Sequence, residues 1–443
     1  MNTLAWKPVL DRGARQGAIE AIRSLAQDLA GGTESSLFPL EELTELGFTS
    51  TRTAITAASL AQGHAGIALF YGELARFSRE GEWLDAAAEQ MNRAIDQASG
   101  ATMGNTLYEG FPGFLFSAVL LDKIVPESCQ CFEDIGGEQA EALSLASLED
   151  TRQGQSFELL FGLAGLGVYF LTRPGSDLYS RALRAILSRM GILARREQQL
   201  ISWFIPPEIL SGKMRDLYPS GYCNLGMAHG DPGAIAFLAK LYKAGFEREE
   251  VSSLLRRSVA WLLEQRLSND EGSFFPEVVA ENVEPHASRL RWCYGDLPIA
   301  VSLWMAGVCL DVPEWRRVAL DTFVKASERP LKEAGTTGPG LCHGLASVAH
   351  IFNRAYQATG EGRLKEASRR WFRALLECRD PGTGIGGWTY EMSNFTTGKP
   401  LWRYNPGLLN GACGVGLALL AAVSDVEPMW DRCMLLDMPP CPM

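Results

Sequence analysis

The chain has 443 residues and a net charge of −11 at pH 7. Hydrophobic residues make up 47% of it and charged residues 21%, which is typical of a globular protein and excludes a disordered chain. The acidic balance argues against a general nucleic-acid binder, because such proteins bind phosphates through clustered lysines and arginines. The chain contains 45 glycines, about a tenth of its residues, against about 7% in an average protein.

The start of the chain lacks the apolar core of a signal peptide and contains an early acidic residue, Asp11. The apolar runs, such as 411–423, are shorter than the ~18 residues that suggest a membrane-spanning helix. We therefore expect a cytoplasmic protein without stable membrane insertion. In that compartment the ten cysteines are not a disulfide framework, so they are core residues, metal ligands or catalytic thiols.

A repeated glycine motif organises the chain after its first 60 residues. Before it, we expect a helix around 14–30 and then a stretch rich in Thr and Ser. The motif is a glycine, two residues, a second glycine or a near-equivalent, and about ten mostly apolar residues. Seven matches of this kind indicate an internal repeat. The first glycines lie 47 to 68 residues apart, at Gly63, Gly110, Gly162, Gly230, Gly295, Gly344 and Gly411.

Two kinds of helix alternate along the repeats. Runs that are apolar on all sides predict interior helices at 66–77, 233–246, 298–310, 347–356 and 414–423. Segments with one apolar stripe and a charged face predict surface helices at 83–98, 178–196, 248–267 and 364–379. The alternation predicts an all-α fold, an α/α toroid in which seven helix-pair repeats form a double seven-helix barrel. Helix pairs at this spacing otherwise build open solenoids.

The repeat makes one large domain over residues 56–425, although the length alone suggests two or three domains. Residues 1–55 are expected to be an N-terminal helical segment that closes the ring. Residues 122–156 are expected to form a loop or a small insertion, and residues 426–443 an irregular C-terminal tail.

Histidines and cysteines stand at the starts of three repeats. His229 precedes the glycine of the fourth repeat, Cys293 lies just before that of the fifth, and Cys342 and His343 before that of the sixth. If all repeat starts face one end of a toroid, Cys293 lies near Cys342 and His343. Two thiolates and an imidazole are good zinc ligands, and three protein ligands leave a fourth position open, as in catalytic zinc sites.

These residues also have a purely structural interpretation. A lone cysteine at a helix start is more often a small buried side chain, and a Cys-His pair alone is a weak signal. Their matching repeat positions favour metal binding. For the other histidines and cysteines the sequence supports packing or structural roles, or assigns none: His64, His286, His350, Cys129, Cys131, Cys223, Cys309, Cys378, Cys413, Cys433 and Cys441.

The motifs resemble those of the lanthionine synthetase C-like (LanC) cyclase family. The resemblance covers roughly residues 55–425, and it implies an α/α toroid of two nested seven-helix layers. It also implies one zinc ion per chain, held by Cys293, Cys342 and His343. It rests on Asn-Leu-Gly-Met-Ala-His-Gly at 224–230, Trp-Cys-Tyr-Gly-Asp at 292–296, Leu-Cys-His-Gly at 341–344 and the sevenfold glycine pattern.

The resemblance further implies catalytic roles for His229, Arg289 and Tyr294, and we assign Trp292, which precedes the first cysteine ligand, to substrate binding. At the third repeat the family typically has an active-site Asp in Asp-x-x-x-Gly-x-x-Gly, where this chain has Glu158. The carboxylate is kept but lies one methylene further out. We expect it to orient His229, with a shifted assignment as the alternative.

The implied activity is that of a zinc-dependent lanthionine synthetase, a thioether-forming cyclase of the carbon–sulfur lyase class. Its substrate would be a dehydrated precursor peptide, with or without a leader, whose cysteine thiol adds to dehydroalanine or dehydrobutyrine. A free thiol has a pKa of ~8.5, and coordination to zinc deprotonates it. His229 would act as acid and base, and Arg289 or Tyr294 would stabilise the enolate. A dehydratase partner is left open.

Three other functions stay open. The same zinc site would serve a LanC-like protein that adds glutathione to dehydroamino acids, or a non-catalytic zinc-containing toroid that binds peptides. A glycosidase is the third, because several toroidal enzymes use paired carboxylates. The acids at repeat starts, such as Glu109 and Asp231, form no convincing pair in the sequence.

Overall fold

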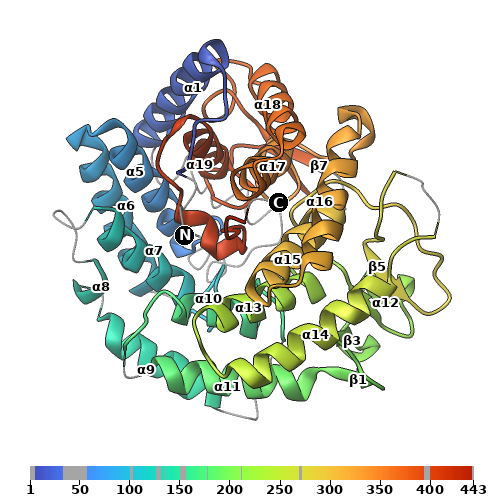
Figure 1. Ribbon diagram of the computed structural model, residues 1–443. Coiled ribbons are helices and arrows are strands. Elements are labelled where there is room, and N and C mark those ends of the chain that lie inside the picture. Colours follow the sequence, from blue (N-terminus) through green and yellow to red (C-terminus); the bar gives the residue numbers. More distant parts are fainter. Residues whose placement is uncertain are drawn as a thin grey trace. The chain divides into compact units, whose positions relative to one another are not determined.

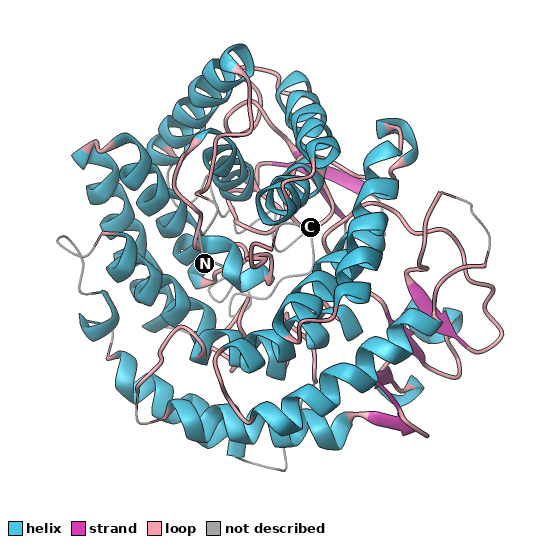
Figure 2. Ribbon diagram, in the orientation of Figure 1, coloured by secondary structure: helices cyan, strands magenta, loops and turns pink. Residues whose placement is uncertain are grey.

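The computed structural model describes residues 5–32, 57–99, 103–125, 131–134, 136–149, 156–176, 178–210, 212–268, 272–393 and 400–441. Helices carry most of this part of the chain, and the strands are short (Figures 1 and 2). None of the described helices is long and apolar enough to cross a membrane. The chain divides into two compact units, each assembled from segments that are distant in the sequence.

The first unit comprises Met1–Asp150, Thr337–Asn353 and Ser368–Trp430. Its helices are α1 (Arg12–Gly31), α5 (His64–Ser78), α6 (Gly81–Ser99), α7 (Phe111–Ile124), α8 (Cys131–Asp134), α9 (Gly137–Glu149) and α19 (Ala412–Val423). Strands β6 (Tyr390–Ser393) and β7 (Pro400–Arg403) form an antiparallel pair. Helices α17 (Leu345–Thr359) and α18 (Gly362–Glu377) are shared between the two units.

The apolar helices α5, α7 and α19 form the interior of the first unit. Helix α5 packs against both α7 and α19, so the first and the last repeat helices are neighbours. Gly416 allows this approach, because a Cβ atom there would lie 2.4 Å from the Phe70 ring. The amphipathic α6 covers α5, and α1 covers α19 (Figure 1). The helix expected around 14–30 is therefore confirmed as α1.

The second unit comprises Thr151–Thr336, Arg354–Ala367 and Asp431–Met443. The apolar helices are α10 (Leu163–Phe170), α13 (Asp231–Lys243) and α15 (Asp296–Cys309), and α13 packs between the other two (Figure 1). The amphipathic helices α11 (Tyr179–Leu193), α14 (Arg248–Glu264) and α16 (Pro313–Glu328) each pack on the apolar helix that precedes them. This alternation agrees with the repeat pattern.

Short strands interrupt the helices of the second unit, and the sequence reasoning did not anticipate them. Strands β1 (Arg195–Glu197) and β2 (Leu200–Ser202) form a hairpin. Strands β3 (Phe204–Ile205), β4 (Tyr222–Asn224) and β5 (Val278–Ala280) form an antiparallel sheet in that order. One turn of 3-10 helix, η1 (Pro207–Ile209), and α12 (Gly212–Leu217) lie between β3 and β4.

The segment 122–156 is more helical than expected. Helices α8 and α9 account for 131–134 and 137–149, and α9 packs against α7. The sequence predicts a loop or a small insertion here because its acidic residues obscure the apolar stripe. Only Leu145 and Leu148 are buried hydrophobic residues in α9, which gives a weak helical pattern. The rest of this segment lies partly outside the described residues.

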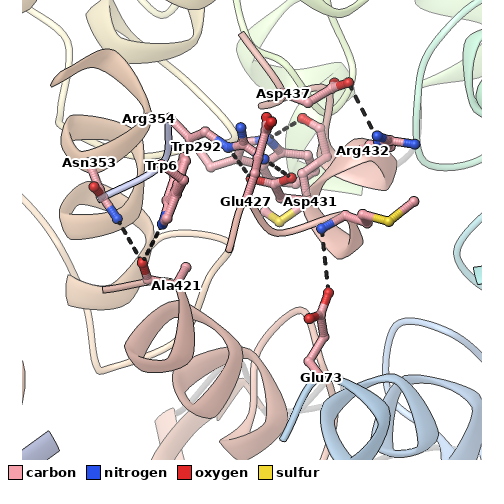
Figure 3. A network of polar contacts seen from close by, with 12 residues as sticks. Trp6, Glu73, Trp292, Asn353, Arg354, Ala421, Glu427, Asp431, Arg432 and Asp437 are labelled. Atoms are coloured by element: carbon pink, nitrogen blue, oxygen red, sulfur yellow. Dashed lines mark hydrogen bonds and ion pairs between the residues drawn. The ribbon is translucent and has the colours of Figure 1, made fainter. Parts of the chain in front are cut away.

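The last residues pack tightly on the second unit, although they form little regular structure. After the 3-10 helix η3 (Trp430–Met434), the chain continues irregularly, and most of its apolar side chains are buried. The indole of Trp304 donates a hydrogen bond to the Pro439 carbonyl, and Lys240 forms an ion pair with Asp437. Figure 3 shows Asp431 in a buried ion pair with Arg354.

A small polar network joins segments of the first unit that are distant in the sequence. The indole of Trp6 and the amide of Asn353 both donate to the Ala421 carbonyl at the end of α19 (Figure 3). The Met429 amide donates to Glu73 of α5. The Trp6 contact attaches the start of the chain to α19, and the Met429 contact attaches the segment after α19 to α5.

Candidate functional site

The fourth repeat begins with a tight loop between β4 and α13. The amide of Gly226 donates to Asn224 Oδ1 at 2.8 Å, so the asparagine caps its own loop. The amides of Leu159 and Leu160 donate to the carbonyl of Ala228, at 3.2 Å and 3.3 Å. The start of the third repeat is thereby fixed against the start of the fourth. This backbone contact sets the distance between Glu158 and His229.

Glu158 and His229 form the closest side-chain pair at these loops. Glu158 Oε2 lies 2.6 Å from His229 Nδ1, and the carboxylate also accepts hydrogen bonds from the amides of Leu160 and Phe161. The Glu158 side chain is 6% exposed, whereas that of His229 is 34% exposed. The Phe161 ring stacks on the imidazole. Because the carboxylate accepts at Nδ1, the basic nitrogen of the neutral imidazole is Nε2.

Cys293 lies in the loop that leads into α15, and this loop packs on the loop of the fourth repeat. A Cβ atom at Gly226 would lie 1.8 Å from the carbonyl oxygen of Cys293, so only glycine fits there. Gly295 has a φ of 92°, which also favours glycine. The Cys293 side chain is buried, at 6% exposed. The glycine at 226 therefore lets the Cys293 loop pack closely against the loop that contains His229.

The first residue of α15 holds the Cys293 loop to a distant segment. Asp296 is fully buried and accepts hydrogen bonds from the amides of Phe274 and Phe275. Arg329 lies 3.6 Å from the carboxylate. Burial raises the pKa of Asp296 to about 6, against the opposing effect of these partners. Asp231, the first residue of α13, plays the same part, because it accepts the amide of Trp203.

Tyr294 and Asn224 connect the two loops through their side chains. The Asn224 amide donates to the Tyr294 hydroxyl at 3.3 Å, and Asn224 itself is fully buried. Burial raises the pKa of Tyr294 well above its usual value. The phenol therefore stays protonated at neutral pH and can donate a hydrogen bond.

Arg289 is held by a partner that no motif predicts. Its Nε and Nη2 donate to the two carboxylate oxygens of Glu277, at 2.7 Å and 2.5 Å. Burial alone would raise the pKa of Glu277, but the hydrogen bonds and charge of Arg289 outweigh it and lower the pKa. The same hydrogen bonds raise the pKa of Arg289. The guanidinium is thus fixed in place while about half of the side chain, 49%, remains exposed.

Trp292 is fully buried, and its indole donates to the Met434 carbonyl at 3.0 Å. This hydrogen bond fixes the position of the residue that precedes Cys293. Contact between Trp292 and a substrate stays a prediction, and the burial favours a supporting role.

Cys342 and His343 belong to the first unit and lie just before α17. The amide of Cys342 donates to the Leu409 carbonyl at 2.9 Å, and the His343 carbonyl accepts the amide of Thr337. Both side chains are partly exposed. The loop is therefore anchored through its backbone, which leaves the thiol and the imidazole as its accessible functional groups.

The remaining histidines and cysteines behave mostly as structural residues. His64 pairs with Gln90 at 2.6 Å, and His350 stacks on Trp430 inside the first unit. Cys223 and Cys413 are buried, whereas Cys378 is exposed and not a packing residue. Cys129 lies outside the described part of the chain.

Residues 54–435 match the lanthionine synthetase C-like protein family. The chain belongs to this family. It is 27% identical over 209 residues to the nisin biosynthesis protein NisC of Lactococcus lactis subsp. lactis, a match that covers 44% of this chain and 48% of NisC. The matched segment thus spans about half the length of that relative.

Solved structures give the fold. Nisin cyclase superposes with a TM-score of 0.71 at 18% identity, covering 89% of this chain and 95% of that one. This likeness shows the α/α toroid fold and confirms the predicted all-α class. Cellobiose 2-epimerase from Bacillus thermoamylovorans B4167 gives a TM-score of 0.45 at 9% identity, covering 82% and 87%.

Compared with the family pattern, the structure explains the departure at Glu158 and adds two residues, Asn224 and Glu277, to the candidate site. The longer Glu158 reaches His229 directly, so the additional methylene does not separate the pair. Sequence reasoning missed Asn224 as the partner of Tyr294, although it begins the motif that contains His229. It also missed Glu277, which follows no motif and lies 12 residues before Arg289.

Proposed function

We propose that this protein is a lanthipeptide cyclase that joins a cysteine thiol of a dehydrated peptide to dehydroalanine or dehydrobutyrine. Membership of the lanthionine synthetase C-like family and the likeness to nisin cyclase support a cyclase. The observation that carries the chemistry is the contact of Glu158 with His229, which gives an imidazole that is about one-third exposed a fixed orientation.

The proposal includes one zinc ion per chain, held by Cys293, Cys342 and His343. The donor set fits, because thiolates and imidazole are the usual ligands of zinc and three of them leave a position for a substrate. Each of the three residues lies directly before an apolar helix, α15 or α17, at the matching place of its repeat. Zinc bound there would lower the pKa of a substrate thiol and supply a nucleophilic sulfur.

His229 would move the proton. In the reaction a carbon–sulfur bond forms at the β-carbon of the alkene, the double bond becomes an enolate, and a proton is delivered to the α-carbon. The proton lost by the thiol and the proton gained by carbon balance, so one acid/base group is sufficient. The hydrogen bond to Glu158 at Nδ1 stabilises the imidazolium that carries this proton and keeps Nε2 directed away from the carboxylate.

Tyr294 and Arg289 would stabilise the enolate oxygen. The phenol of Tyr294 remains a donor because its pKa is raised by burial, and Asn224 fixes its position. Arg289 uses Nε and Nη2 for Glu277, so Nη1 is the donor left by these two bonds. Oriented donors of this kind typically contribute several kcal/mol to a reaction that develops negative charge, on the order of 3 kcal/mol each.

A mass-spectrometric assay tests the function. The purified protein is incubated with a dehydrated peptide that contains one cysteine, and free thiols are then alkylated. Cyclisation is expected to abolish alkylation without a change in peptide mass. With glutathione present, a gain of one glutathione would instead support the glutathione-adding alternative, and peptide binding without reaction would support the non-catalytic one.

The metal assignment is tested by zinc content. Cys293→Ala/Cys342→Ala is expected to lose stoichiometric zinc and all cyclisation, whereas Cys309→Ala, a cysteine outside the proposed ligands, should keep both. Stoichiometric zinc in the double variant would contradict the ligand assignment. The precursor peptide, a dehydratase partner and the cytoplasmic location stay predictions.

A further inference from the structure

A groove of about 870 Å³ in the second unit is not used by the chemistry proposed above. It lies between the β1–β2 hairpin, the β3–β4–β5 sheet and the end of α14. These elements are neighbours in Figure 1, and β2 packs directly on α14. The volume is in the range of about 300–1,000 Å³ that is typical of ligand sites.

One wall of the groove is an apolar row across the sheet. Phe204, Cys223 and Val279 are register partners on the three strands, so their side chains share one face. Burial raises the pKa of Cys223 to about 12, which keeps the thiol neutral. Trp261 of α14 contributes a further apolar surface.

The charged side chains of the groove are mostly acidic. Glu197, Glu264 and Glu281 line it, and Arg195 is the basic residue among its lining side chains. Arg195 forms an ion pair with Glu197, and its guanidinium lies 5.1 Å from the centre of the Phe204 ring. Glu264 and Glu281 then give the groove a net negative charge, which favours a basic ligand.

The sheet also offers backbone groups for pairing. Strands β3 and β5 are the outer strands, and Val279 and Ala280 of β5 line the groove. An outer strand presents amides and carbonyls to which an extended peptide can add as a further strand. Between β3 and β4 the chain exposes the apolar side chains of Ile209 and Leu217.

The same strands also position the candidate site. Successive residues of a strand point to opposite faces, so Cys223 faces the groove while Asn224 reaches Tyr294. Glu277 directly precedes β5 and holds Arg289. The groove and the candidate site therefore share the strands of this sheet.

We infer that this groove binds an extended segment of the peptide substrate in which basic and apolar residues alternate. The segment adds to the edge of β5, its apolar side chains contact Val279 at the near end of the apolar row, and its basic side chains approach Glu264 and Glu281. The identity of the peptide as a substrate rests on the proposed function. The groove would hold a part of it that lies outside the ring being closed.

The test is fluorescence anisotropy with a labelled peptide of about eight alternating Lys and Val residues. Glu264→Lys/Glu281→Lys is expected to bind it at least about tenfold more weakly than the wild type, and to gain affinity for the same peptide with Glu in place of Lys. Glu284→Lys, an exposed residue that does not line the groove, is the matched control and should bind like the wild type. N-methylation of alternate residues should also weaken binding about tenfold, because it removes the paired amides.

Cys342→Ala separates this inference from the proposed function, because that residue lies in the other unit. It should bind the Lys-Val peptide like the wild type even though cyclisation is lost. Equal affinity of the wild type and the double variant, or equal affinity for the Lys and Glu peptides, would overturn the inference whatever the cyclase assay shows. A wild-type dimer that the double variant dissociates would overturn it too, because the occupant would then be a second copy of the chain.

Discussion

Two arginine–carboxylate pairs in the second unit have the same geometry and opposite surroundings. Arg354 binds Asp431 through Nε at 2.6 Å and Nη2 at 2.7 Å, and both side chains are almost fully buried (Figure 3). Arg289 binds Glu277 through the same two atoms, at 2.7 Å and 2.5 Å, but its side chain is 49% exposed. The first pair attaches the last segment of the chain, and the second lies in the candidate site.

The difference shows that surroundings, and not contact geometry, decide what such a pair contributes. A charge left without its partner in the interior is strongly unfavourable, whereas water compensates the loss at a half-exposed position. The Arg354 pair should therefore govern folding, and the Arg289 pair should govern the position of a functional group. The four substitutions below test this division.

The largest effect is expected for Arg354→Met, which leaves Asp431 buried without its partner. The free energy of unfolding should fall by about 3–5 kcal/mol, measured by urea denaturation. Replacing both partners, in Arg354→Met/Asp431→Leu, should recover much of that loss because no buried charge remains. A loss of less than about 1 kcal/mol in the single variant would contradict a structural role for the buried pair.

Asp296 is a further buried acidic residue of the second unit, and its contribution to the stability of the fold should depend on pH. Its pKa is raised to about 6 in the folded protein, so the folded state binds the proton more tightly than the unfolded state. The stabilisation is complete below about pH 4 and is lost as the pH rises through 6, by on the order of 3 kcal/mol. Asp296→Asn should remove this dependence. Urea denaturation of both proteins at several pH values measures it, and parallel curves would contradict the expectation.

Glu158→Gln tests a residue of the candidate site, where a substitution should change activity more than stability. The substitution keeps the size of the side chain but removes the charge that stabilises the imidazolium of His229, so kcat should fall about 100-fold. The melting temperature should change little. Glu158→Asp, which restores the charge at a shorter reach, should recover part of the rate. A normal kcat in Glu158→Gln would exclude an orienting role.

The smallest effect is expected for Arg289→Lys. An ammonium group cannot form both hydrogen bonds to Glu277, so the cyclisation rate should fall about tenfold. The free energy of unfolding should change by less than about 1 kcal/mol, because the pair is half exposed. A loss of stability as large as that of Arg354→Met would break the distinction between the two pairs.

The sequence predicts best what depends on local pattern. The glycine repeats and apolar runs locate α5, α13, α15 and α19 because each pattern lies within one helix. The pairing of Glu158 with His229 was expected from the family resemblance, and the structure brings the two side chains together. Convergence of Cys293 with Cys342 and His343 stays a prediction, because these residues belong to different units.

The sequence does not predict contacts that join distant segments without a motif. Arg354 and Asp431 are 77 residues apart, and neither residue is distinguished by its neighbours. Strands β1 to β5 have only two or three residues each, too few for an alternating pattern to be recognised. The groove between them follows from this packing, and so it could be found only in the structure.

The most direct test is the initial rate of thiol loss from a dehydrated cysteine-containing peptide, measured by alkylation for the wild type and for His229→Ala at equal zinc content. We expect the wild type to convert the peptide without a mass change, and His229→Ala to be at least about 100-fold slower with an unchanged melting temperature. Full retention of alkylatable thiol by zinc-loaded wild type, or equal rates for the two proteins, would contradict the proposal that this site closes thioether rings.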